Sequence, residues 1–191
     1  MVKKILILLG HPDNESMCRE FADSYAFGAR KAGNEVRRVN VGDLQFDPIL
    51  HKGYKVIQEL EPDLVKLQED IRWCEHFVVI YPSWWSTMPA LLKGLFDRMW
   101  LPGFAYKFPD PGFGWKRLLK GRTARVFVSS DSHPILARLL FGDNTNEIKD
   151  GILWFAGFKA RIKKVGPMKN ISPKGRAKWV KKFEKYGEAI Y

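Results

Sequence analysis

Cysteine is scarce in this chain, and its histidines are widely scattered. Cys18 and Cys74 form no Cys-x-x-Cys pair, and the histidines at positions 11, 51, 76 and 133 have no metal-ligand spacing. Disulfide scaffolds and structural zinc sites use such residues in closely spaced sets. The sequence therefore argues against a metal site and a disulfide framework. It indicates a reducing compartment, with the cytoplasm as the expected location.

Long apolar runs and several common motifs are also missing. No stretch reaches the ~20 apolar residues of a membrane span, and the run at positions 5–9 ends at His11-Pro12 without the cleavage site of a signal peptide. The chain has no Gly-x-Gly-x-x-Gly fingerprint, no lysine-bearing phosphate loop and no Gly-x-Ser-x-Gly elbow. We therefore expect neither a Rossmann or P-loop nucleotide site nor a serine hydrolase.

Acidic residues are few in the last forty positions. From position 152 to 191 there are eleven Lys or Arg and two Glu, so nine of the chain's eleven excess positive charges lie there. Such a segment can attract nucleic acid, an anionic membrane surface or anionic cofactors. Without a nucleic-acid-binding signature beside it, a solvated basic helix face is the favoured interpretation. We expect no nucleic-acid partner, and peripheral membrane contact through this basic third stays open.

The pattern that is present predicts an α/β protein of one domain over residues 1–191. Apolar strand-like runs alternate with segments of helical periodicity, so we expect a doubly wound parallel sheet with helices on both faces. The expected strands are 3–9, 35–41, 76–81, 123–129 and 160–165. The expected helices are 16–32, 62–74, 89–100, 144–155 and one from 172 onward, with 135–141 either a short helix or irregular.

One stretch, residues 78–100, combines a strand, an aromatic turn and a helix. Pro82 ends the strand, and Pro89 occupies the first turn of the helix. Between them lie two tryptophans at the carboxyl end of a strand, where open α/β sheets bind ligands. Because adjacent residues cannot both face one core, we expect either Trp84 or Trp85 to be exposed or to face a ligand.

Four sequence features carry a family resemblance. They are Tyr-Pro-x-x-Trp at 81–85, Met-Pro-Ala-x-x-Lys-Gly-x-x-Asp-Arg at 88–98, Gly-Phe-Ala-Tyr at 103–106 and Gly-Ile-Leu-Trp-Phe-Ala-Gly-Phe at 151–158. With Gly10-His11-Pro12 and Ser16 as a phosphate loop, the chain resembles the flavodoxin-like NAD(P)H:quinone reductases nearly throughout. The resemblance implies a flavodoxin-like five-stranded parallel sheet in the order 2-1-3-4-5. Three loops, 11–17, 82–88 and 130–134, would then meet at one edge.

The resemblance also implies a flavin in these loops, with FMN favoured over FAD. The candidate cofactor contacts are His11, Ser16, Met17 and Cys18; Pro82, Ser83, Trp84, Trp85 and Ser86; and Ser130, Asp131 and Ser132. From the residues alone, Ser16 can equally be a helix N-cap. The structural alternative for the tryptophans, that both are core residues, is disfavoured because the two are adjacent.

The chain departs from the family at several positions of this site. Met17-Cys18 replace Phe-Asn, and residues 129–132, Ser-Ser-Asp-Ser, replace the Thr-Thr-Gly-Gly of animal members. The family's proton-transferring Tyr and His have no clear match, which leaves His133 as the catalytic candidate. Tyr106, in an aromatic segment that resembles a lid shared across a dimer interface, is the substrate-pocket candidate. The long segment 101–120 is expected to be a binding loop or a dimer contact.

The expected activity is two-electron transfer in two half-reactions, from NAD(P)H through flavin N5 to a quinone or similar acceptor, in a homodimer with shared sites. The alternative is a flavodoxin-like regulatory or ancillary subunit of a membrane transport system, such as potassium efflux, with its basic third as the docking surface. Other charged residues receive structural interpretations. Asp97-Arg98 is expected at the surface or in a cap, and Glu59, Glu61, Asp63, Glu69 and Asp70 on a solvated helix face.

Overall fold

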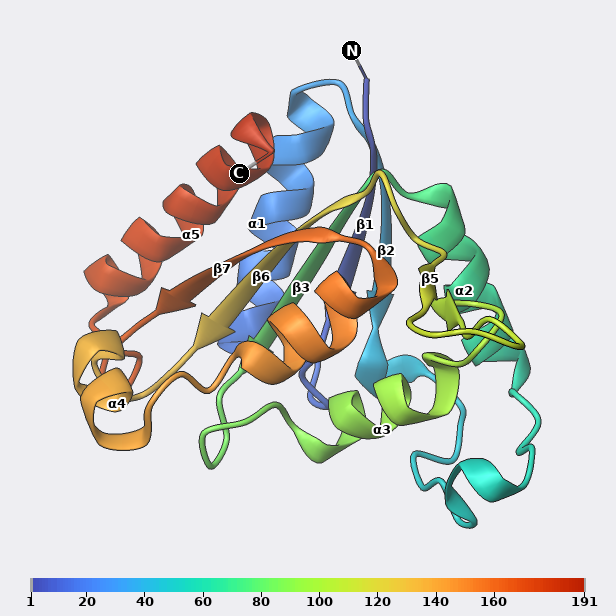
Figure 1. Cartoon of the computed structure of the whole chain (residues 1–191). Coiled ribbons are helices and arrows are strands. Elements are labelled where there is room, and N and C mark those ends of the chain that lie inside the picture. Colours follow the sequence, from blue (N-terminus) through green and yellow to red (C-terminus); the bar gives the residue numbers. More distant parts are fainter. Residues whose placement is uncertain (1, 191) are drawn as a thin grey trace.

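A five-stranded parallel sheet runs through the computed structural model, which describes residues 2–190 (Figure 1). Each pair of neighbouring strands is parallel. The strand order confirms the expected 2-1-3-4-5 arrangement of the flavodoxin-like fold. In that order the strands are β2 (Glu35–Asn40), β1 (Lys4–Leu9), β3 (His76–Pro82), β6 (Thr123–Ser129) and β7 (Lys159–Val165).

Helices cover both faces of the sheet (Figure 1). α1 (Met17–Lys31) and α5 (Pro173–Ala189) pack on one face. On the other face lie α2 (Pro62–Trp73), α3 (Ala90–Met99) and η3 (Glu147–Trp154), which is wound as a π-helix. Because both faces are covered, the three central strands are almost entirely buried and apolar.

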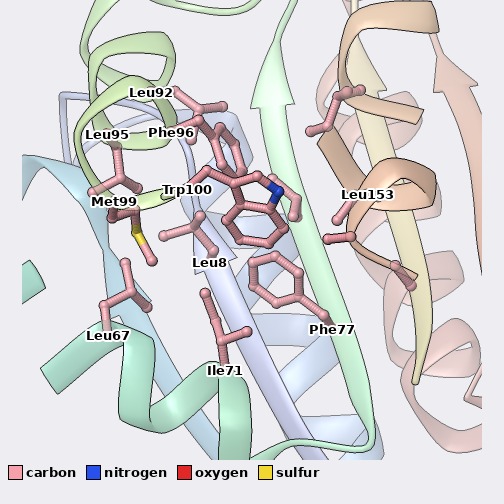
Figure 2. Close-up of a cluster of buried hydrophobic side chains, with 14 of the residues drawn as sticks. Leu8, Leu67, Ile71, Phe77, Leu92, Leu95, Phe96, Met99, Trp100 and Leu153 are labelled. Carbon is pink, nitrogen blue, oxygen red and sulfur yellow. The ribbon is translucent and has the colours of Figure 1, made fainter. Parts of the chain in front are cut away.

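Alternate residues of the central strands supply the two cores. Ile5 and Ile7 of β1 face α1 and α5, whereas Leu6 and Leu8 face α2 and α3. Figure 2 shows the second of these clusters around Trp100, with side chains from the sheet and from α2, α3 and η3: Leu8, Leu67, Ile71, Phe77, Leu92, Leu95, Phe96, Met99 and Leu153.

Smaller elements lie in the connections. They are η1 (Val41–Asp43), η2 (Gly53–Lys55), α4 (Pro134–Phe141) and the antiparallel pair β4 (Tyr106–Lys107) and β5 (Lys116–Arg117). The stretch 135–141, undecided from sequence, is thus helical. Among residues 2–190, no helix is both long and apolar enough to cross a membrane.

Two expectations about charged residues are wrong. Arg98 is 1% exposed, and its guanidinium donates two hydrogen bonds of 3.0 Å to the carboxylate of Glu61. It also donates to the carbonyl oxygens of Asp47 and Glu59, so it ties α3 to the loop before α2. Asp70 is 5% exposed and accepts hydrogen bonds from Arg37 and Lys66. Glu61 and Asp70 therefore do not belong to a solvated helix face.

Candidate active site

The loops that follow β1, β3 and β6 meet at the carboxyl end of the sheet. Backbone hydrogen bonds continue the strand pairing beyond the strand ends and hold the loops together. The Gly10 N–H donates to Ile80 O over 2.8 Å, and the Ser83 N–H donates to Ser129 O over 2.7 Å. The Ser130 N–H donates to Val165 O over 3.0 Å, which adds the end of β7 to the group. The expected convergence therefore occurs.

The second of these loops is a tight hairpin with an exposed aromatic tip. Trp84 and Thr87 exchange both backbone hydrogen bonds, 2.9 and 3.0 Å long. The two residues between them, Trp85 and Ser86, have φ of +50° and +63°. Such a type I′ turn favours Gly, Asn and Asp, and other residues cost on the order of 1–3 kcal/mol. Trp85 is 100% exposed and Trp84 43%, so both are more open than core residues.

A pocket of about 620 Å³ opens between this hairpin and the third loop. Its size falls within the range of about 300–1,000 Å³ that is usual for small-molecule sites. All eight candidate residues of the second and third loops line it: Pro82, Ser83, Trp84, Trp85, Ser86, Ser130, Asp131 and Ser132. The pocket thus combines serine hydroxyl groups with aromatic and apolar side chains.

The first loop adjoins the pocket through His11. Its ring lies edge-on to Trp84, with centroids 5.3 Å apart. Burial lowers the pKa of His11, and the negative charge of Asp13 only partly offsets this. The His11 Nδ1 accepts a hydrogen bond from the Asp13 N–H over 2.9 Å. In the neutral ring that results, Nε2 carries the proton and is the available donor.

Ser16 is the N-cap of α1, since its Oγ accepts from the Arg19 N–H over 3.3 Å. The first-turn N–H groups at Met17 and Cys18 have no partner within the helix and can bind an anion. The Cys18 side chain is buried and lies 3.3 Å from Ser129 Oγ, and burial raises the pKa of its thiol to about 11. The contact predicted for Cys18 can therefore come only from its backbone.

Neither catalytic candidate lines this pocket within one chain, although His133 lies in the third loop between two residues that do. His133 is exposed and caps α4, because its Nδ1 accepts from the Ile135 N–H over 3.3 Å. Tyr106 packs edge-on against Phe108 and Phe155, and it lines a separate recess of about 250 Å³. Within a single chain, neither ring is therefore among the residues that line the pocket.

Among the lining residues that the sequence did not predict, three make polar contacts. Asn144 donates to Ser83 Oγ over 3.0 Å, and the Met168 N–H donates to Ser130 O over 2.9 Å. Lys164 forms an ion pair of 3.3 Å with Asp143. A hydrogen bond from the Thr145 hydroxyl, with help from Lys164, holds the pKa of Asp143 below its usual range. Lys164 was open to prediction, because the end of β7 reaches the same sheet edge as the three loops.

The residues present fit a flat, polar-edged ring that carries a phosphate. Trp84 and Trp85 offer aromatic surface, the serines offer hydroxyls, and the start of α1 offers N–H groups. Among the described residues lining the pocket, Lys164 is the one base and Asp131 the one acid. Within residues 2–190, no three His, Cys, Asp or Glu gather into a set that could hold a metal ion.

A protein-family model described as a flavodoxin-like fold matches residues 3–161. The chain is also 25% identical over 186 residues to NAD(P)H dehydrogenase (quinone) 1 of Rattus norvegicus, a match that covers 83% of this chain and 66% of that protein. It spans less than two thirds of the length of the curated relatives that it matches first.

Two solved structures share the fold over the whole chain. The NAD(P)H:quinone oxidoreductase from Methanothermobacter marburgensis matches with a TM-score of 0.83 and 22% identity, over 100% of both chains. An FMN-dependent NADH-azoreductase from Bacillus anthracis, solved in complex with FMN, matches with a TM-score of 0.74 and 17% identity, over 99% of each chain. At such identities the similarity establishes the fold.

Proposed function

Because the chain belongs to the Flavodoxin_2 family of flavodoxin-like folds, we propose that it is a flavin-dependent NAD(P)H oxidoreductase that passes two electrons to a quinone or a similar acceptor. The observation that carries this proposal is the pocket between the second and third loops, against which the first loop lies at His11. A hydroxyl- and aromatic-lined pocket with a helix N-terminus beside it suits a flavin mononucleotide. The Bacillus anthracis structure, which contains FMN, supports FMN over FAD.

Each loop has a role in holding the cofactor. The first turn of α1, together with Ser16 and His11, would bind the phosphate. The hairpin tip at Trp84 and Trp85 would pack against the ring, whose polar edge would meet Ser83 and the 130–132 loop. Held by these loops, a flavin would supply two-electron hydride transfer between NAD(P)H and the acceptor.

The chain's own contribution is orientation and electrostatics. The backbone of the hairpin and of Ser130 is fixed by the sheet, so donors and acceptors are placed before a ligand arrives. Lys164 adds a positive charge at the pocket wall, which favours the extra negative charge of a reduced ring. Asp143 holds the Lys164 ammonium in place.

We further propose that the working unit is a homodimer with two shared sites. Tyr106 and Phe155 form an aromatic recess that one chain leaves apart from its own pocket. In a symmetric dimer the same recess could meet the partner's pocket and complete the substrate site. Substrate and acceptor would then bind in turn between the ring and this recess.

Anaerobic half-reactions test the proposed activity. The flavin-loaded protein is mixed with NADH or NADPH, and its visible absorbance is followed. We expect the flavin band to bleach with at least one nucleotide and to return when a soluble quinone is added. A flavin band that neither nucleotide bleaches would refute the oxidoreductase activity and would favour the ancillary-subunit alternative.

A further inference from the structure

Helix α4 is apolar on nearly all sides and yet faces solvent. None of its eight residues is buried. Ile135, Leu139 and Leu140 are 67%, 78% and 65% exposed, and Leu136 and Phe141 are also more than half exposed. Contiguous exposed apolar surface of this kind marks a place of interaction.

The exposed side chains surround the helix instead of forming one stripe. Since successive residues are about 100° apart, Ile135 and Leu139 share one side, Leu140 lies on the next and Phe141 on a third. A flat protein surface would cover only part of this circumference. A fluid apolar phase would cover every side that the protein leaves exposed.

The helix forms one surface with the mouth of the pocket. Pro134, Ala137 and Phe141 line the same pocket as Trp84 and Trp85. α4 and the loop that carries the two tryptophans lie toward the same end of the sheet (Figure 1). Tryptophan favours the boundary between bilayer and water, where its ring meets both phases.

Positive charge accompanies this apolar surface. Arg138 lies on α4, Lys169 follows Met168 beside the 130–132 loop, and Lys174 lies in the first turn of α5; all three are exposed. Among the described residues these three bases have no ion pair. The acids nearby include Asp131, Asp143 and Glu147; Asp143 is paired with Lys164, and Glu147 accepts a hydrogen bond of 2.6 Å from the Thr87 hydroxyl of the hairpin. Apolar side chains with a basic surround favour the surface of an anionic bilayer.

We propose that α4 inserts into the headgroup boundary of an anionic membrane beside the tryptophan hairpin, so that the pocket opens toward the lipid phase. The contact itself requires only α4, the hairpin and the bases. Its consequence, that the acceptor is a lipid-soluble quinone which enters from the bilayer, rests on the proposed function.

Vesicle sedimentation of the full chain tests the membrane contact. Vesicles of phosphatidylcholine with phosphatidylglycerol are compared with vesicles of phosphatidylcholine alone. We expect binding to the anionic vesicles that is at least tenfold stronger and that weakens as salt is added. Leu139→Glu should reduce binding about tenfold or more, whereas Val65→Glu, at an exposed position of α2, should bind as the wild type does.

Two results would overturn the proposal. One is equal binding of the wild type and Leu139→Glu to the anionic vesicles, or no binding by either. The other is a change from dimer to monomer in sedimentation equilibrium of Leu139→Glu, because α4 would then be covered by a second copy.

Leu139 does not line the pocket, so this variant should keep its flavin and its turnover with a water-soluble quinone. A loss of both would point instead to failure of the fold or of the proposed function.

Discussion

At the scale of single residues, the candidate site depends on a backbone conformation that its own side chains disfavour. Trp85 and Ser86 both have left-handed backbone conformations, and neither is the glycine that the turn favours. The surrounding sheet enforces this conformation through the bonds at Trp84, Thr87 and Ser83. Strain of this kind gathers at ligand-binding sites. A ring that is wholly exposed at a strained position is better explained by a ligand than by stability.

Two variants of the hairpin separate its effect on stability from its effect on ligand binding. Ser86→Gly should raise the free energy of unfolding by about 1 kcal/mol, because glycine relieves the left-handed strain. Trp85→Ala should change it by less than about 0.5 kcal/mol, yet weaken flavin binding about tenfold, which corresponds to about 1.4 kcal/mol. Denaturant unfolding and fluorescence titration with FMN measure the two effects. Flavin binding by Trp85→Ala at wild-type strength would contradict a role for the ring.

A buried histidine at the other end of β3 should make stability depend on pH. His76 is 5% exposed, and its Nδ1 lies 2.7 Å from Thr123 Oγ1. Burial, with help from the charges of Lys3 and Arg125, lowers its pKa to about 4. The unfolded chain, with a pKa of about 6.5 at this residue, binds the proton first as the pH falls. Stability is therefore complete above about pH 6.5 and is lost toward pH 4.

The loss should amount to about 3 kcal/mol over that interval, at about 1.4 kcal/mol per pH unit. Urea unfolding at a series of pH values measures it, and His76→Gln removes the titrating group. The variant should show a flatter pH profile between about pH 4 and 6.5. Equal slopes for the two proteins would show that His76 does not cause the effect.

At the scale of elements, the sequence predicts the five strands to within one residue at each end, because runs such as 5–9 are apolar on both faces. It does not decide α4, since a segment that is apolar all round shows no helical period. The π winding of η3 also escapes prediction, because it shifts the pattern by only one residue per turn. Arg98 was misplaced because its partners at Asp47, Glu59 and Glu61 are distant in sequence.

The buried ion pair of Arg98 should contribute more to the free energy of unfolding than the exposed pair of Lys93, which lies on the same helix. Arg98→Ala should lower the free energy of unfolding by about 3–5 kcal/mol, because it leaves Glu61 and two carbonyl oxygens without their donor. Burial raises the pKa of Glu61, but the bonds from Arg98 and the Asp47 N–H more than offset this and hold it below its usual range. Lys93→Ala, which breaks the exposed pair with Asp97, should cost less than about 1 kcal/mol. Thermal or denaturant unfolding of the two variants makes the comparison, and equal losses would contradict it.

At the scale of the whole molecule, the topology makes the site. Strands β1, β3 and β6 are neighbours only in this order, so loops far apart in sequence meet at one sheet edge. The second and third loops were therefore predictable from the sequence together with the family resemblance. The placement of Tyr106 was not, because one chain holds it in a separate recess. The apolar surface at α4 was not predictable from the sequence either, since it depends on which side chains the rest of the fold leaves exposed to solvent.

The central claim, that the pocket holds a flavin, is tested most directly by the visible spectrum of the purified protein. Chromatography of whatever heat releases from it then identifies the cofactor. We expect a yellow protein with flavin absorbance that releases FMN. A colourless protein that stays colourless after incubation with both FMN and FAD would contradict the claim, and the Ser130–Ser132 loop would then be the first place to look for the reason.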